Sequence, residues 1–343
     1  MGKATITLKN TPSVISSAAI GGKMESEGPM GEYFDKINND PYLSTDTFEK
    51  GESQLQKQAI LHALEKANIN ESDIDVMFGG DLLNQCVGTT YGTRDFGIPF
   101  LGIYGACSTM AEGLLMSSIS VDGGYAKKAL AVTSSHFCTA ERQYRFPLNY
   151  GGQRPPTAQW TATASGSLIV SKKEKPPYVR AVTVGKIVDM GVTDANNMGA
   201  AMAPAAFDTI SQFFKDTGLK PDYFDAVVTG DLGKVGSRII CELFERENLS
   251  ITNNHKDCGT MLYSFEEQDV HAGGSGCGCA GSILCGYFIP QLRKGTMKNI
   301  LFAATGALMS PTMCQQGESI PGISHAIWLS NELPDGMPDI SFD

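Results

Sequence analysis

Apolar positions along the chain alternate between helical and strand-like spacing. Residues 50–68 carry apolar side chains at a helical period, and the short apolar run that follows, residues 75–78, predicts a buried strand. In the second half, residues 205–214 predict a helix that Gly218 caps, followed by a strand over 226–228. The same order of helix and strand is therefore predicted twice.

The segments that follow extend this alternation. Residues 98–104 predict a strand, 110–121 a helix and 128–133 another strand. The helix is apolar nearly all round, which is typical of a buried helix. Residues 137–164, rich in arginine and aromatic side chains, are predicted to be a long functional loop before a strand resumes at 165–170. Alternating strands and helices predict an α/β fold.

Two strings of residues recur in the same order. Residues 73–82 and 223–232 both end in Gly-Asp-Leu, and residues 123–134 resemble residues 294–305. A long-period repeat of this kind indicates a duplicated domain. The Lys- and Pro-rich segment 172–177 is the clearest linker. We therefore divide the chain into an N-terminal half, residues 1–175, and a C-terminal half, residues 176–343.

Composition narrows the classes of function. The chain has 343 residues and a net charge of −10, which argues against nucleic acid as a general partner. Its apolar runs are too short for a membrane span of about 20 residues, and MGKATITLKN lacks the apolar stretch of a signal peptide. The 9 cysteines include no CxxC pair, so we expect reduced thiols, no metal site and no cofactor.

Cys107 is the best-placed candidate for chemistry. It lies in Gly-Ala-Cys-Ser-Thr, residues 105–109, between a predicted strand and the buried helix. A helix N-terminus lowers the pKa of a thiol and holds anions through its dipole and free N–H groups. The alternative is a buried thiol that only packs at a tight turn.

This arrangement resembles the thiolase and ketoacyl-synthase superfamily. The resemblance covers Gly-Asp-Leu, the Cys107 turn and its buried helix, and further strings at residues 163–170, 271–282 and 304–308. It implies a thiolase-like fold: two duplicated α/β halves whose central mixed sheets sandwich buried helices. It also implies a homodimer that pairs through the edges of these sheets.

A narrower resemblance is to the stage V sporulation protein AD family. Its strings are residues 80–85, 100–109, 133–136 with 139–143, 201–206, 272–277 and 304–312. This resemblance implies a protein that binds dipicolinic acid (pyridine-2,6-dicarboxylate), free or as its calcium chelate. It also implies a role in uptake into developing spores, with membrane-embedded stage V sporulation A proteins as partners. The expected location is peripheral, on the cytoplasmic side of the spore inner membrane.

The residues around the predicted site favour binding over catalysis. A condensing enzyme of this superfamily needs a His after the strand at 226–228 and a His or Asn in its Gly-rich turn. Here Asp231 follows that strand, and the turn reads Ser-Gly-Cys at 275–277. A carboxylate near Cys107 would raise the pKa of the thiol. The alternatives are an active acyltransferase or condensing enzyme that uses Cys107 on acyl thioesters, or a structural protein with a vestigial pocket.

A planar aromatic dianion needs arginine or helix N-termini for its carboxylates and an apolar slot for its ring. By this reasoning the candidate ligand-binding residues are Cys107, His136, Asp81, Asn84, Arg142, Arg145, Asp231 and Cys277. Each type has a structural alternative: a core histidine, a surface ion pair, or an aspartate that caps a turn. The matched Asp81 and Asp231 also prompt the hypothesis that both touch the calcium of a chelate.

Overall fold

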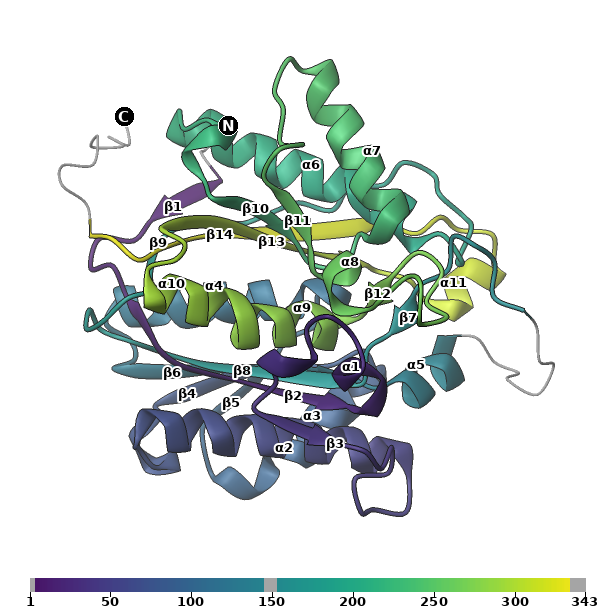
Figure 1. Cartoon of the computed structure of the whole chain (residues 1–343). Helices are drawn as coiled ribbons and strands as arrows, with labels where there is room; N and C mark the ends of the chain where they lie inside the picture. Colours follow the sequence, from purple (N-terminus) through teal and green to yellow (C-terminus); the bar gives the residue numbers. More distant parts are fainter. Residues whose placement is uncertain (1–3, 145–152, 334–343) are drawn as a thin grey trace.

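The computed structural model describes residues 4–144 and 153–333, and in these ranges two sheets alternate with layers of helices (Figure 1). The strands of the first half are β2 (Ser13–Gly22), β4 (Val76–Gly80), β5 (Phe100–Gly102), β6 (Lys128–Ser135) and β8 (Ala164–Ser171). Their order is β2-β8-β6-β4-β5. Strand β4 is parallel to β5 and β6, whereas β8 is antiparallel to β6 and β2.

The second half repeats this arrangement. Its strands are β9 (Tyr178–Thr183), β10 (Ala226–Thr229), β11 (His255–Asp257), β13 (Asn299–Ala307) and β14 (Gly322–Ser330). Their order is β9-β14-β13-β10-β11, with β10 parallel to β11 and β13, and β14 antiparallel to β13 and β9. The two sheets meet where Ser13 of β2 pairs with Tyr178 of β9. The predicted duplication is therefore confirmed in the topology.

Short strands complete the structure. They are β1 (Thr5–Thr7), which pairs with β9, β3 (Lys36–Asn38), which pairs with β2, and the pair β7 (Trp160–Thr161) and β12 (Gly274–Ser275). The change from the first set of strands to the second falls in the linker 172–177. Strand β1 crosses this division, because it joins the sheet of the other half. The division at residue 175 stays an interpretation.

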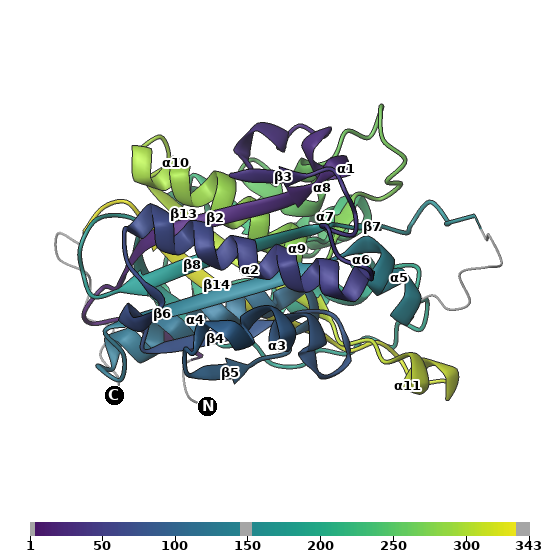
Figure 2. The same ribbon diagram turned by 90° about the horizontal axis from the view of Figure 1, so that it is seen from below.

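Helices cover both outer faces and fill the space between the sheets. Helices α2 (Phe48–Ala67) and α3 (Val87–Thr93) lie on the outer face of the first sheet (Figure 2), and α6 (Met198–Thr217) and α7 (Gly233–Arg246) on that of the second. Between the sheets lie α4 (Thr109–Asp122) and the helical run α9 (Cys277–Ile283), η8 (Leu284–Phe288) and α10 (Ile289–Lys294). The short helices are α1 (Lys23–Ser26), α5 (Phe137–Tyr144), α8 (Cys258–Leu262) and α11 (Pro311–Gln315).

Helix α4 is buried as its apolar sequence predicts. It contacts β6 of one sheet and β14 of the other. Met110, Ala111, Leu114 and Leu115 are at most 4% exposed. Each fully buried side chain of the size of leucine stabilises the fold by about 2 kcal/mol, so this helix helps hold the two halves together.

The repeated aspartates Asp75 and Asp225 have the same structural role. Oδ2 of Asp75 accepts hydrogen bonds from the backbone N–H groups of Lys127 and Lys128, at 2.6 and 3.0 Å. Oδ2 of Asp225 accepts from Lys298 and Asn299, at 2.6 and 2.9 Å. In each half the carboxylate therefore ties the loop before one strand to the start of its parallel neighbour.

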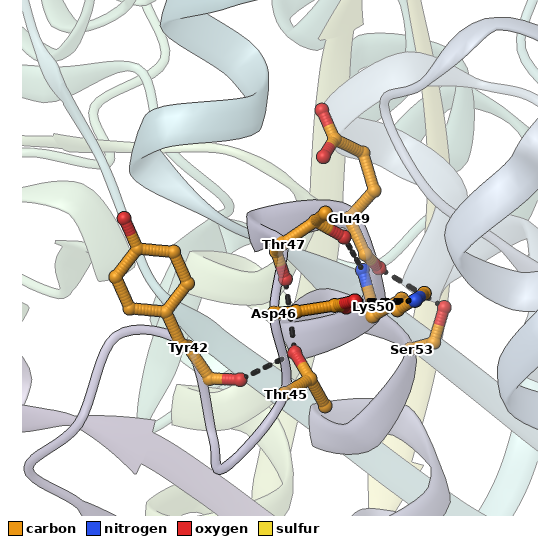
Figure 3. A network of polar contacts seen from close by, with 7 residues as sticks. All are labelled: Tyr42, Thr45, Asp46, Thr47, Glu49, Lys50 and Ser53. Carbon is orange, nitrogen blue, oxygen red and sulfur yellow. Dashed lines mark hydrogen bonds and ion pairs between the residues drawn. The ribbon is translucent and has the colours of Figure 1, made fainter.

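Helix α2 begins in a network of polar contacts (Figure 3). The side chain of Thr47 accepts a hydrogen bond from the backbone N–H of Lys50, and the Lys50 ammonium lies 2.7 Å from Asp46 Oδ1. Ser53 Oγ donates to the Glu49 carbonyl one turn earlier, at 3.1 Å. An N-cap of this kind stabilises a helix by about 1 kcal/mol, and it fixes the turn that carries the buried Glu52.

The segment 137–164 was predicted to be one long loop, and the structure differs from this prediction. Residues 137–144 form α5, which buries Thr139, Ala140 and Glu141, and residues 160–161 form β7. The loop prediction was wrong here because an amphipathic helix of two turns is too short to show a clear period. None of the helices in the described ranges is long and apolar enough to cross a membrane.

Candidate ligand-binding site

Side chains from both halves meet where the parallel strands end. Leu82 follows β4, Cys107 follows β5 and Asp231 follows β10, while Leu308 follows β13 and Cys277 opens α9. Leu82, Cys107, Cys277 and Leu308 pack together in one apolar cluster with residues of α5. Ligands of open α/β sheets bind at the carboxyl ends of the strands, so this cluster is the candidate site.

Cys107 lies in the 3-10 turn η5 (Ala106–Ser108) that leads into α4, as predicted, and is 8% exposed. Burial raises the pKa of its thiol well above the usual value, and the neighbouring Asp231 and Cys277 raise it further. The expectation of a lowered pKa at this thiol was wrong: the pKa is raised, and burial is the largest cause. The expected effect of a nearby carboxylate is confirmed.

Asp231 is fully buried beside Cys107. Its Oδ2 accepts hydrogen bonds from the Gly276 backbone N–H at 2.7 Å and from Ser275 Oγ at 3.2 Å. Its Oδ1 accepts no hydrogen bond of standard geometry from the described residues. Burial raises the pKa of this carboxyl to about 7, and its contacts with Cys107 and Gly276 limit the rise.

Asp81 matches Asp231 in sequence but not in surroundings. Its Oδ1 accepts from the Leu83 N–H at 2.8 Å, and its Oδ2 accepts from both the N–H and the hydroxyl of Thr89, at 2.7 and 2.6 Å. These bonds are those of an aspartate that caps a turn, the structural alternative. Asp81 is also next to Glu52, whose pKa is raised to about 8 by burial and by the Asp81 charge.

Cys277 contacts both the first sheet, at Ser134, and the apolar cluster around Cys107. Its Sγ donates to the Ser134 carbonyl at 2.9 Å, and burial raises the pKa of its thiol well above the usual value. The preceding Gly276 has φ of 101°, and a Cβ there would lie 2.6 Å from Ser135 Oγ. Only glycine fits this turn, which aims its N–H at Asp231.

Two tyrosines at the site were missed by the sequence analysis. The hydroxyl groups of Tyr104 and Tyr144 are 3.1 Å apart, and Tyr144 donates to the Leu82 carbonyl at 2.5 Å. The pKa of both phenols is raised, chiefly by burial, with a contribution from the neighbouring Cys107. Tyr104 remains 44% exposed. Its position next to Gly105 is the one sequence signal that places it near Cys107.

The remaining candidates are engaged away from Cys107. His136 Nε2 lies 2.8 Å from the Pro41 carbonyl, and its Nδ1 accepts from the Cys138 N–H, as in a core histidine. Arg142 forms an ion pair with Glu49 at 2.8 Å.

Asn84 is exposed, and its backbone N–H donates to Gln143 Oε1 at 2.9 Å. Arg145 lies outside the described residues. Within the ranges that are described, no group of three or more His, Cys, Asp or Glu side chains is arranged to hold a metal ion. A calcium contact of Asp81 and Asp231 therefore stays a prediction.

Comparison with known proteins now identifies the family. Residues 2–330 match the profile of stage V sporulation protein AD. The curated stage V sporulation protein AD of Bacillus subtilis (strain 168) is 44% identical over 326 residues, covering 95% of this chain and 96% of the relative. The chain belongs to the stage V sporulation protein AD family. It is a sporulation protein with a thiolase-like fold, as both resemblances implied.

Solved structures of other proteins share the fold of this member of the stage V sporulation protein AD family. A variant of OleA from Xanthomonas campestris has a TM-score of 0.61 at 13% identity and covers 95% of this chain and 99% of its own. The 3-oxoacyl-[acyl-carrier-protein] synthase III of Aquifex aeolicus VF5 has a TM-score of 0.57 at 13% identity, covering 93% and 99%. At this identity they establish the fold alone.

We expect Cys107 to react slowly with alkylating reagents, because the thiolate is the nucleophile and the raised pKa keeps this thiol protonated. With iodoacetamide at pH 7.5, peptide mass mapping should show Cys107 labelled about 100-fold more slowly than the half-buried Cys314. Labelling of Cys107 ahead of Cys314 would contradict a raised pKa and would favour the enzyme hypothesis.

Proposed function

We propose that this protein binds dipicolinic acid at the Cys107 site without transforming it and supports its uptake into developing spores. The observation that carries the proposal is the pairing of the Cys107 thiol with Asp231, where a condensing enzyme needs a histidine. Burial and this carboxyl keep the pKa of the thiol high, so the site lacks an activated nucleophile.

The residue types at the site support an aromatic ligand. Leu82, Ala106 and Ala140 offer apolar side chains. The phenols of Tyr104 and Tyr144, whose hydroxyl groups are 3.1 Å apart, offer aromatic rings and hydroxyl oxygens that can accept hydrogen bonds. An apolar slot with a few convergent polar groups is the usual form of a small-molecule site. The ligand enters as free dipicolinate or as its calcium chelate.

Partners and location are part of the same proposal. Phe100 and Leu101 on the edge strand β5 are 38% and 53% exposed, which supports a homodimer through this edge. We further propose that the protein works peripherally at the cytoplasmic side of the spore inner membrane, with membrane-embedded stage V sporulation A proteins as partners.

The test is calorimetric titration with dipicolinate, with and without calcium. Wild-type protein should bind, and Cys107→Trp, which fills the cluster around the thiol, should weaken binding by about tenfold or more. The control is Cys314→Ala, a half-buried cysteine on α11, which should bind as wild type does. Equal affinity for wild type and Cys107→Trp would place the ligand elsewhere.

The alternative function, an acyltransferase or condensing enzyme, makes a different prediction for the same protein. Exposure to an acyl-CoA should then add the mass of the acyl group to Cys107, with turnover. A purely structural role predicts no binding of dipicolinate at all. Binding without acylation supports our proposal.

A further inference from the structure

Asp231 stands behind Cys107 in the candidate site. Asp231 has no exposed surface, whereas Cys107 is 8% exposed. A ligand that contacts the Cys107 thiol therefore does not need to touch Asp231, but its charge comes close to that of the carboxyl. Asp231 can influence the ligand through this charge and through the thiol between them.

Of the titratable side chains that face Asp231 from other elements, the Cys107 thiol supports its negative charge as a hydrogen-bond partner, and the others are further acids. These side chains are the thiols of Cys107, Cys258, Cys277 and Cys279 and the carboxyl of Asp257. Within the described residues, the strongest electrostatic influences on the pKa of Asp231 include no lysine or arginine.

The neighbouring Asp257 is better provided with donors. Its oxygens accept hydrogen bonds from the Leu232, Gly233 and Thr260 N–H groups, at 2.8, 3.0 and 3.0 Å, and from Thr229 Oγ1 at 2.7 Å. Asp231 has Gly276 and Ser275 on one oxygen, at 2.7 and 3.2 Å, and the Cys107 thiol as its further partner. Of the two carboxyls, Asp231 is the one that gains more from a proton.

We propose that an anionic ligand binds at Cys107 together with one proton, which Asp231 takes up. This inference rests on the proposed function, since it concerns how the same site tolerates a carboxylate. A ligand carboxylate beside the thiol repels an ionised Asp231, and protonation removes that repulsion. A protonated carboxyl also gains a hydrogen-bond donor, which the ionised form lacks. Asp231 is in this sense a positioning residue for the anion.

Linkage fixes the direction of the pH dependence. The empty site has a pKa of about 7 at Asp231, and an anion beside it raises that pKa further. Affinity should then be highest below pH 7 and fall, by up to about tenfold per pH unit, as the pH rises above 7. Glu52 also titrates near this range and reaches the site through Cys277, so the assignment needs a variant.

The experiment is calorimetry with dipicolinate at pH 6, 7 and 8 in two buffers of different ionisation enthalpy, which counts the protons taken up. Wild type should take up close to one proton near pH 8. Asp231→Asn, which is neutral at every pH, should take up none and should bind with an affinity that is flat from pH 6 to 8. Asp225→Asn, at the opposite end of β10, should keep the wild-type pH dependence.

The outcomes separate the two proposals. Dipicolinate binding by wild type without proton uptake, or uptake that persists in Asp231→Asn, overturns the inference and leaves the proposed function in place. Absence of dipicolinate binding at every pH overturns the proposed function itself. Should Asp231→Asn fail to fold, as thermal unfolding would show, Glu52→Gln decides: proton uptake that persists in this variant supports Asp231, and uptake that is lost overturns the inference.

Discussion

Replacing Gly306 with alanine is expected to lower the free energy of unfolding by about 3 kcal/mol and to displace the turn that carries Cys107. Gly306 lies in β13, opposite Ile323 of β14, and its α-carbon faces the turn before η5. A Cβ at this position would lie 2.0 Å from the carbonyl oxygen of Gly105 and 3.0 Å from its carbonyl carbon. Both are backbone atoms, so no side-chain rotation relieves the clash.

The backbone at this contact has little freedom to move. Ala106 already has φ of 48°, in the left-handed region, which an L-residue adopts at a cost of about 1 kcal/mol. Strand β13 is paired with β14 along its whole length, Gly306 included, and with β10 over residues 300–303. The methyl group of alanine must therefore push the Cys107 turn toward the site rather than distort the sheet.

Urea unfolding of Gly306→Ala and wild type measures the loss of stability, and dipicolinate titration measures the effect on the site. Gly102→Ala is the matched control, because its Cβ would meet only the Phe100 ring at 3.4 Å and its φ is not left-handed. The control should change stability by less than about 1 kcal/mol. Equal stability of Gly306→Ala and wild type would contradict the close packing of β13 on this turn.

The duplicated scaffold was predictable because local signals repeat. Asp75 and Asp225 hold the same positions in both halves, and Gly218 caps α6 as its sequence indicates. Strand β2 was not predicted, because its sequence SVISSAAIGG consists mainly of small residues, in which polar and apolar positions do not alternate. Such a strand is buried on both faces, and burial of small side chains leaves no periodic pattern to read.

The site was only partly predictable, because it depends on which segments the fold brings together. The sequence placed Cys107 at the start of the buried helix and anticipated the effect of Asp231 on its pKa. It did not distinguish Asp81 from Asp231, since both follow a strand in Gly-Asp-Leu. Their difference arises from a turn far along the chain, where Gly276 donates to Asp231.

The second large effect concerns stability and pH. Glu52 on α2 and Asp81 after β4 form a buried pair of carboxyls. Glu52 accepts hydrogen bonds from Ser134 Oγ at 3.0 Å and from Thr139 Oγ1 at 2.7 Å. Burial and the Asp81 charge raise the pKa of Glu52 to about 8. The folded protein then holds a proton that the unfolded chain, with an ordinary carboxyl pKa, releases above about pH 4.5. Stability therefore falls as the pH rises toward 8.

The range from pH 6.5 to 8 excludes the buried histidines, and Asp231, with a pKa of about 7, contributes a smaller decline in the same range. Buried His255 and His325 have a pKa lowered by burial to about 4, so they add stability as the pH rises, but only up to their unfolded pKa of about 6.5. Above pH 6.5 the buried carboxyls therefore determine how stability changes with pH. We expect the free energy of unfolding to drop by about 2 kcal/mol between pH 6.5 and 8, with Glu52 as the main source.

Urea unfolding at half-unit pH steps tests this expectation, and Glu52→Gln assigns it. The amide is neutral throughout, so the variant should lose most of the decline in stability between pH 6.5 and 8. Glu65→Gln, an exposed position further along α2, should retain the wild-type slope. A slope that persists unchanged in Glu52→Gln would contradict Glu52 as its source and would assign the decline to the other buried carboxyls, Asp81 and Asp231.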